Sequence, residues 1–154
     1  MIMDGHRTDY SQITENIIIG SDLCPGPGCP VHSEEFKNLG VCAEVNLEIE
    51  RNEKPTPGID VYLWLPTEDK QAPNPDQLAI GTAAINEMVK TNKTIYVHCR
   101  NGHGRSPTMV AAYLIRYRNM GVSEAIALIK QKRPEIHPEE VQIKALEEFY
   151  KTCA

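Results

Sequence analysis

The spacing of apolar and polar residues predicts strands early in the chain and helices late. Apolar residues at every second position over 41–47 have the two-residue period of a strand. The β-branched run at 16–20 and the apolar runs at 61–65 and 94–97 predict three more strands. Pro66 is expected to end the third of these four strands.

Apolar positions at helical spacing, together with capping residues, predict five helices. Three are expected to follow the caps Ser33, Asn74 and Ser123, one to span 106–120, and the last to start at His137-Pro138. The helix over 106–120 is apolar on almost every side, which is typical of a helix in the middle of a domain. The residues expected to face inward in the others are Phe36, Leu39, Leu78, Ile85, Met88, Val89, Val122, Ile126, Ile129, Val141, Ala145 and Phe149.

These elements predict an α/β fold in which a central sheet of four or five strands is flanked by helices. We expect 1–154 to form a single domain, since 154 residues with 41% hydrophobic content suffice for one core. No run approaches the roughly 18 apolar residues of a membrane span, and the polar start "MIMDGHRTDY" lacks the apolar segment of a signal peptide. We therefore expect a cytoplasmic protein without stable membrane insertion.

Charge and cysteine content narrow the classes of function. A net charge of −5 argues against a general nucleic-acid binder, although a local positive site is compatible with it. Five cysteines is an odd number, and in a reducing compartment most are expected to be free thiols. Nothing in the sequence requires a partner subunit, so we expect a monomer.

One segment, "HCRNGHGRS" at 98–106, concentrates the candidate chemistry. We expect a loop between the strand at 94–98 and the helix at 106–120 whose backbone N–H groups surround an anion, because Gly102 and Gly104 let consecutive amides turn inward. The same positive environment favours the thiolate form of Cys99. The planar guanidinium of Arg105 can hold two phosphoryl oxygens at once.

This segment matches the Cys-x5-Arg-Ser/Thr signature, and the chain resembles the dual-specificity branch of the protein tyrosine phosphatase superfamily. The similarity runs from about residue 16 to 150 and is strongest over "WLPTED", "IYVHCRNGHGRSPTMVAAYLI" and "EAIALIK". The resemblance implies a cysteine-dependent phosphatase fold and a shallow pocket that accepts phosphotyrosine and phosphoserine or phosphothreonine. It implies no metal and no cofactor.

The resemblance also implies residue roles. Cys99 would be the nucleophile, Arg105 the clamp on the transition state, and Ser106 the hydroxyl that stabilises the departing thiolate. A general acid is also needed, and Asp69, 30 residues before Cys99 and just beyond a strand, is our candidate, with Asp76 and Glu68 as rivals. His98 would orient the loop, and the phosphate would be held by Arg100, Asn101, Gly102, His103, Gly104 and Arg105.

Other motifs are given structural interpretations. Cys24, Cys29 and His32 have the ligand types of a zinc site, but a fourth ligand is not evident, so a surface loop is preferred. Cys42 is expected in the core and Cys153 in a terminal tail; whether either protects Cys99 from oxidation is left open. Arg133 is interpreted as an exposed basic residue at a helix end, with a second anion site as the alternative.

We therefore expect a phosphomonoester hydrolase that forms a cysteinyl-phosphate and acts on phosphorylated proteins or a small phosphomonoester. The alternative with the same chemistry is a phosphatase for phosphoinositides or phosphatidylglycerophosphate. A noncatalytic phosphate-binding module is a further alternative, although such domains typically lose the cysteine or the acid, and both are present here. A rhodanese-type sulfurtransferase would leave Asp69 and the Arg105-Ser106 pair unexplained.

Overall fold

The fold is a five-stranded mixed sheet with helices on both faces. The computed structural model describes residues 9–22, 30–53, 55 and 58–153, and for 30–33 the backbone alone. The strand order is β1-β2-β5-β3-β4; β1 is antiparallel to β2, and all other neighbours are parallel. The strands are β1 (Tyr10–Gln12), β2 (Ile17–Gly20), β3 (Val41–Glu48), β4 (Val61–Thr67) and β5 (Thr94–His98).

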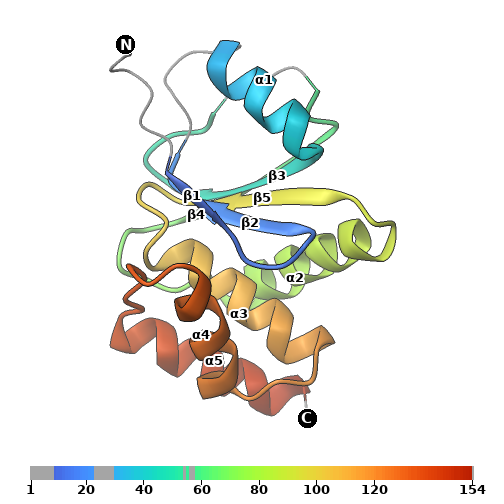
Figure 1. Cartoon of the computed structure of the whole chain (residues 1–154). Helices are drawn as coiled ribbons and strands as arrows, with labels where there is room; N and C mark the ends of the chain where they lie inside the picture. The colour runs from blue at the N-terminus through green and yellow to red at the C-terminus, as the bar shows by residue number, and fades with distance from the viewer. Residues whose placement is uncertain (1–8, 23–29, 54, 56–57, 154) are drawn as a thin grey trace.

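The helices divide unequally between the two faces of the sheet. One lies above the sheet in Figure 1 and the other four lie below it. They are α1 (Pro30–Leu39) above, and α2 (Pro75–Lys90), α3 (Arg105–Tyr117), α4 (Val122–Lys132) and α5 (Glu140–Cys153) below. The predicted α/β fold is confirmed.

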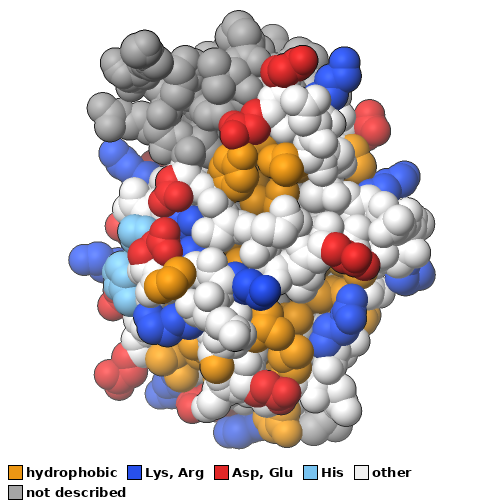
Figure 2. Space-filling model, in the orientation of Figure 1, with side chains coloured by type: hydrophobic (Ala, Val, Ile, Leu, Met, Phe, Trp, Pro, Cys, Tyr) orange, Lys and Arg blue, Asp and Glu red, His pale blue; other side chains and the backbone are white. Residues whose placement is uncertain are grey.

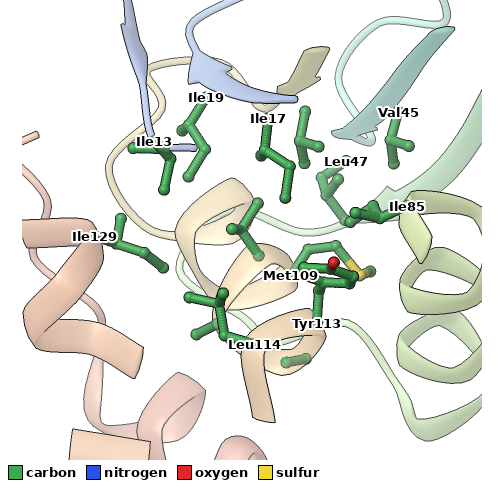
Figure 3. Close-up of a cluster of buried hydrophobic side chains, with 14 of the residues drawn as sticks. Ile13, Ile17, Ile19, Val45, Leu47, Ile85, Met109, Tyr113, Leu114 and Ile129 are labelled. Atoms are coloured by element: carbon green, nitrogen blue, oxygen red, sulfur yellow. The ribbon is translucent and has the colours of Figure 1, made fainter. Parts of the chain in front are cut away.

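Successive residues of the central strands belong to two hydrophobic clusters on opposite faces of the sheet, because side chains alternate across a strand. Ile17 and Ile19 of β2 face the main core beneath the sheet (Figure 3). Ile18 instead joins Phe36 and Tyr96 in a smaller cluster on the side of α1. Helix α3 lies at the centre of the main core and packs against α2, α4 and α5. The predicted central position of this helix is therefore correct.

The start of α2 is fixed by a reciprocal cap that also anchors the preceding loop. The Gln77 N–H donates to Asn74 Oδ1 at 2.8 Å, and the Asn74 N–H donates to Gln77 Oε1 at 2.9 Å. The Gln77 side-chain amide also donates to the carbonyl of Pro66 at 2.8 Å. Both ends of the segment 68–73, which contains Asp69, are thus held in place.

Several predicted boundaries in the first half are wrong. Helix α1 begins at Pro30, before the predicted cap Ser33, and Leu39 is exposed rather than inward. Strand β4 continues through Pro66 to Thr67, which is tolerated because β4 is an edge strand and a proline there removes no necessary donor. The three-residue edge strand β1 was not predicted.

Boundaries and faces also differ in the last three helices. Helix α3 begins at Arg105 and ends at Tyr117, and α4 is capped by Gly121 rather than Ser123. In α5 the expected inward residue Val141 is 42% exposed. Its buried residues are Gln142, Leu146 and Phe149, so only the last of these was predicted.

Candidate active site

The carboxyl ends of the parallel strands β2, β5 and β3 meet at one edge of the sheet, and the loop 99–104 begins there. His98, the last residue of β5, is paired with Gly20 on one side and Asn46 on the other. The Cys99 N–H donates to the carbonyl of Gly20 at 3.4 Å. The loop then leads directly into α3 at Arg105. This edge is the usual ligand site of parallel α/β sheets.

The Cys99 sulfur is buried and surrounded by donors. It accepts a hydrogen bond from the Gly102 N–H at 3.2 Å and lies 3.4 Å from the hydroxyl oxygen of Ser106, which is fully buried. Cys99 and Ser106 therefore lie together, as the loop motif required.

Gly102 cannot be replaced in this loop without a steric clash. Its φ of +75° lies in the left-handed region that favours glycine. A Cβ at this position would approach the carbonyl carbon and oxygen of Gly20 to 2.6 and 2.7 Å. The conformation that aims the Gly102 N–H at Cys99 is thus available to glycine alone.

Arg105 is buried at the floor of the site and is held by three groups from other parts of the chain. Nη1 donates to Glu50 Oε1 and to the carbonyl of Thr67, both at 2.7 Å. Nη2 donates to Glu50 Oε2 at 3.0 Å and lies 3.6 Å from Asp69 Oδ1. These contacts fix the plane and the position of the guanidinium.

The charges of Glu50 and Arg105 stabilise each other. Hydrogen bonds from Arg105 lower the pKa of Glu50, against the opposing effect of partial burial. Burial opposes the charge of Arg105, but the hydrogen bond with Glu50 and the nearby Cys99 raise the pKa of its guanidinium overall. Glu50 thus remains a carboxylate and Arg105 a cation.

Asp69 lies in the loop after β4, on the same pocket as Cys99 and Arg105, with its side chain 62% exposed. The two rivals do not line this pocket: Glu68 is exposed on the same loop, and Asp76 is exposed in the first turn of α2. Of the three predicted candidates for the general acid, the structure brings Asp69 alone to the site.

The pocket is small and polar. It has a volume of about 110 Å³ and is lined by Asp69, Lys70, Cys99, Asn101, His103, Gly104, Arg105, His137, Glu139 and Gln142. The rings of His103 and His137 lie 5.4 Å apart between centroids, and Figure 2 shows histidine side chains among acidic and basic ones at the left edge of the molecule. Burial, Arg133 and His137 lower the pKa of His103.

The backbone of this pocket is reinforced from α5 and from the segment between α4 and α5. The Gln142 side-chain amide donates to the carbonyl of Gln71 at 3.0 Å, and Gln142 Oε1 accepts from the Glu139 N–H at 2.8 Å. The His137 N–H donates to the carbonyl of His103 at 2.9 Å. The acid loop and the cysteine loop are therefore tied to the same C-terminal segment.

Arg133 was predicted to be an exposed residue at a helix end, and this prediction is wrong because its side chain is fully buried. Its Nε donates to the carbonyl of Gly102 at 2.9 Å and its Nη2 donates to that of Asn101 at 3.2 Å. Its Nη1 and Nη2 also reach Ser11 Oγ at 3.0 Å and Asp9 Oδ2 at 3.2 Å. Arg133 supports the loop from behind and faces away from the pocket lining.

His98 lies on the α1 side of the sheet, where it stacks on Tyr96 and contacts two buried glutamates. Its Nε2 lies 2.7 Å from Glu44 Oε2 and 3.1 Å from Glu53 Oε1. Burial would lower the pKa of His98, but these contacts raise it to about 10. Burial, aided by a hydrogen bond with Glu53 and opposed by His98, raises the pKa of Glu44 to about 7.

The remaining predicted residues lie elsewhere. The exposed Arg100 lines a separate pocket with Asp22, Glu48, Glu50 and Arg51, so its side chain is not on the substrate pocket. Cys42 is half-buried rather than in the core, and Cys153 ends α5 rather than lying in a tail. Cys24 and Cys29, and the side chain of His32, lie outside the described residues.

Sequence reasoning missed Glu44, Glu50, Glu53, Lys70, His137, Glu139 and Gln142. These residues carry no local motif, and "EIERNEKPTPG", which contains Glu50 and Glu53, was interpreted as a surface connection. Only pairing of the strands and packing of the C-terminal helices bring them to the loop. Across the described part of the chain, the helices are too short or too polar to cross a bilayer.

Comparisons with known proteins agree with this geometry. Residues 28–152 match the dual specificity phosphatase catalytic domain. The chain is 30% identical over 149 residues to phosphatidylglycerophosphate phosphatase PTPMT1 of Arabidopsis thaliana, covering 92% of this chain and 42% of the relative. It is 38% identical over 120 residues to phosphatidylglycerophosphatase and protein-tyrosine phosphatase 1 of Homo sapiens, covering 77% and 50%. The chain thus spans half or less of these two relatives.

Solved structures show the same fold. The structure of PTPMT1 in complex with PI(5)P superposes with a TM-score of 0.81 at 26% identity, covering 94% of this chain and 96% of the other. Human DUSP28 gives a TM-score of 0.78 at 21% identity, covering 93% of both chains. The match over most of the chain, together with the loop around Cys99, shows that the protein belongs to the dual specificity phosphatase family of cysteine-dependent phosphatases.

Proposed function

We propose that Cys99, Arg105, Asp69 and Ser106 are the catalytic residues of this phosphatase. The observation that carries the proposal is their arrangement around one pocket. The Cys99 sulfur faces the Gly102 N–H and the Ser106 hydroxyl, Arg105 is fixed by Glu50, and Asp69 lies 3.6 Å from the Arg105 guanidinium. Nucleophile, oxyanion donors and a proton donor are thus within reach of one phosphoryl group.

In the first step, the Cys99 thiolate attacks phosphorus and forms an S–P bond while the bond from phosphorus to the leaving oxygen breaks. Asp69 gives its proton to that oxygen, because an alkoxide is a poor leaving group. The amides of the loop and the Arg105 fork hold the equatorial phosphoryl oxygens. The alcohol departs and the cysteinyl-phosphate remains.

In the second step, water attacks the phosphorus of the cysteinyl-phosphate and Asp69, now a carboxylate, takes the proton from that water. The S–P bond breaks and inorganic phosphate is released. The sulfur leaves as a thiolate, and the Ser106 hydroxyl, 3.4 Å away, donates a hydrogen bond to it. Asp69 is again protonated, so the cycle closes.

For the substrate, the polar lining of the pocket favours a leaving group that carries hydroxyls, such as the glycerol of phosphatidylglycerophosphate. Asn101, His103 and Gln142 offer hydrogen bonds to such a group, and no phenylalanine, tyrosine or tryptophan is among the pocket residues. The two relatives named above are phosphatidylglycerophosphatases by name, and the human one is also a protein-tyrosine phosphatase by name. Phosphoproteins are the second candidate, supported by the family match itself.

The test compares turnover of p-nitrophenyl phosphate, phosphatidylglycerophosphate in mixed micelles, and phosphotyrosyl and phosphothreonyl peptides, all with EDTA present. We expect activity on p-nitrophenyl phosphate that Cys99→Ser abolishes, and the highest kcat/KM on the lipid. Equal activity of Cys99→Ser and the parent would refute the catalytic assignment. A higher kcat/KM on the peptides would assign the protein to the second substrate class.

We also propose a monomeric protein of the cytoplasm. We propose a monomer because nothing in the sequence requires a partner subunit, and the cytoplasm because the sequence has no apolar run long enough for a membrane span. Light scattering after size-exclusion chromatography measures the molar mass and hence the oligomeric state. Fractionation of cells that express the tagged protein shows its compartment.

A further inference from the structure

A buried cluster of three ionisable side chains lies behind the cysteine loop, outside the substrate pocket. Glu44 comes from β3, Glu53 from the segment after it, and His98 from the end of β5. All three are buried, and the atoms that face one another lie within 4.8 Å. The proposed phosphatase steps do not use any of the three groups.

The cluster holds two carboxyl groups against one imidazole. If all three were ionised, one net negative charge would be buried, which is costly in a medium of low polarity. Glu44 Oε1 is buried and accepts no hydrogen bond from the described residues, and the Glu53 carboxyl is its neighbour. A single proton held between the two carboxyl groups makes the cluster neutral while His98 stays cationic.

Contacts of this cluster lead to the backbone of Cys99 and to the segment that holds Arg105. The Nδ1 of His98 lies 3.4 Å from the carbonyl oxygen of Cys99, the residue that follows it. Glu53 pairs with Arg51 in the segment that also contains Glu50, the carboxylate that holds Arg105. The Asn46 side-chain amide donates to the carbonyl of Arg51 at 2.9 Å and fixes this segment against β3.

We propose that Glu44 and Glu53 are positioning residues: with one proton shared between them they hold His98 as an imidazolium, and this neutral cluster sets the reactive conformation of the Cys99 loop. The inference rests on the proposed function, since it concerns the nucleophile of that function. Loss of the shared proton leaves a buried negative charge beside the loop and weakens the reactivity of Cys99.

The direction of the pH effect follows from the pKa values of Glu44 and His98 in the folded protein. The pKa of Glu44 is raised from 4.5 to about 7, so its contribution to stability is complete below about 4.5 and is lost as the pH rises through about 7. His98, with a pKa of about 10, remains charged over this range. The other titratable and charged groups that face the cluster are Glu48, Arg51, Tyr62, Tyr96 and Cys99.

A bound divalent metal is the competing explanation for two carboxylates and a histidine in contact. Ligands to zinc lie about 2.0–2.2 Å from the ion, which separates them from one another by roughly 3 Å or more. The 2.7 Å between His98 Nε2 and Glu44 Oε2 is a hydrogen-bond distance and does not admit an ion between these atoms. A proton, rather than a metal, fits the geometry.

The test is the rate at which iodoacetamide alkylates Cys99, followed by intact mass between about pH 5 and 9. Alkylation needs neither Asp69 nor a phosphate ester, so it separates this inference from the proposed function. In the parent we expect an inflection near pH 7 beyond which the rate of alkylation falls below the trend. Glu44→Gln keeps the size and the contact with His98 but cannot ionise, so we expect the inflection to disappear.

Glu48→Gln is the matched control, because Glu48 is also a buried glutamate of β3 whose pKa is raised to about 7, by burial and by Asp22. We expect the inflection to persist in this variant. Should Glu44→Gln fold poorly, Glu53→Gln tests the same shared proton. An inflection that survives in Glu44→Gln or Glu53→Gln, or that vanishes in Glu48→Gln, would overturn the proposal, as would one equivalent of metal in the purified parent by mass spectrometry.

Discussion

The carboxylate of Glu50 meets the guanidinium of Arg105 fork to fork, with Oε1 and Oε2 accepting from Nη1 and Nη2 at 2.7 and 3.0 Å. Two parallel hydrogen bonds fix the plane of the guanidinium as well as its position. Arg105 therefore presents its remaining donors in one orientation before any phosphate binds. Such preorganisation is the main source of electrostatic catalysis.

Replacement of Glu50 should reduce catalysis without removing any catalytic group. In Glu50→Gln one of the two charged hydrogen bonds is lost, because the amide nitrogen cannot accept from the guanidinium, and since such bonds are worth about 1.5–3 kcal/mol we expect kcat/KM to fall by about one to two orders of magnitude. Steady-state kinetics on p-nitrophenyl phosphate measures kcat/KM of the parent and of the variant. Glu68→Gln, an exposed acid of the neighbouring loop, is the control and should match the parent.

The same pair predicts a pH dependence of stability. Because the pKa of Glu50 is lowered in the folded state, its contribution is present above about 4.5 and is lost as the pH falls through the folded-state value. The difference in melting temperature between the parent and Glu50→Gln should therefore narrow as the pH is lowered below about 4.5. A difference that widens in acid would contradict this assignment.

Asp69→Asn should show the signature of a lost general acid. We expect kcat/KM, which reports the step in which the leaving group departs, to fall by ~10² to 10⁴ on an alkyl phosphate such as phosphatidylglycerophosphate, because an alkoxide needs the proton most. The fall should be much smaller for p-nitrophenyl phosphate, whose phenolate leaves more readily. Asp76→Asn, in the first turn of α2, is the matched control. Equal losses on both substrates would instead indicate that Asp69 acts in binding.

Gly102→Ala should disable the loop. The left-handed backbone costs a non-glycine residue about 1–2 kcal/mol, and the new Cβ would clash with Gly20 at 2.6 Å. We expect loss of most activity and a lower melting temperature. Gly121→Ala serves as the control, because its φ is −80° and a Cβ there meets nothing within 4 Å. Full activity of Gly102→Ala would refute the amide geometry described above.

The sequence was sufficient for the parts of the site that are contiguous in the chain. Cys99, Arg105 and Ser106 lie within eight residues between a strand and a helix, so one motif specifies them together. Asp69 was placed from its distance to the cysteine and its position after a strand. Each of these inferences depends on the order and spacing of residues along a short stretch of the chain, which a single sequence contains.

The groups that hold those residues could not be predicted, because they come from distant segments. Glu50 is brought to Arg105 only by the parallel pairing of β3 with β5, and the order of strands is not encoded locally. The inward face of α5 was misjudged since Gln142, a polar residue, is buried where it can hydrogen-bond to Gln71 and Glu139. Polar residues buried for their hydrogen bonds do not follow the hydrophobic period.

Arg133 was misjudged for both of these reasons, because its partners lie in distant segments and it is a polar residue buried for its hydrogen bonds. The position of Arg133 at the end of α4 suggested exposure, yet its guanidinium reaches the carbonyls of Gly102 and Asn101 and the Ser11 hydroxyl in three directions. The compact ammonium of lysine cannot span these acceptors, so Arg133→Lys keeps the charge but leaves part of the loop unsupported.

We expect Arg133→Lys to lower kcat/KM by about tenfold, equivalent to one lost hydrogen bond to a charged group, and to weaken inhibition by vanadate in parallel. Parallel loss is the expected signature of a displaced loop, because vanadate and the transition state use the same amides. Arg116→Lys, which alters an exposed arginine of α3, should leave both quantities unchanged. If Arg133→Lys lost stability but kept vanadate affinity, Arg133 would support the fold and not the loop.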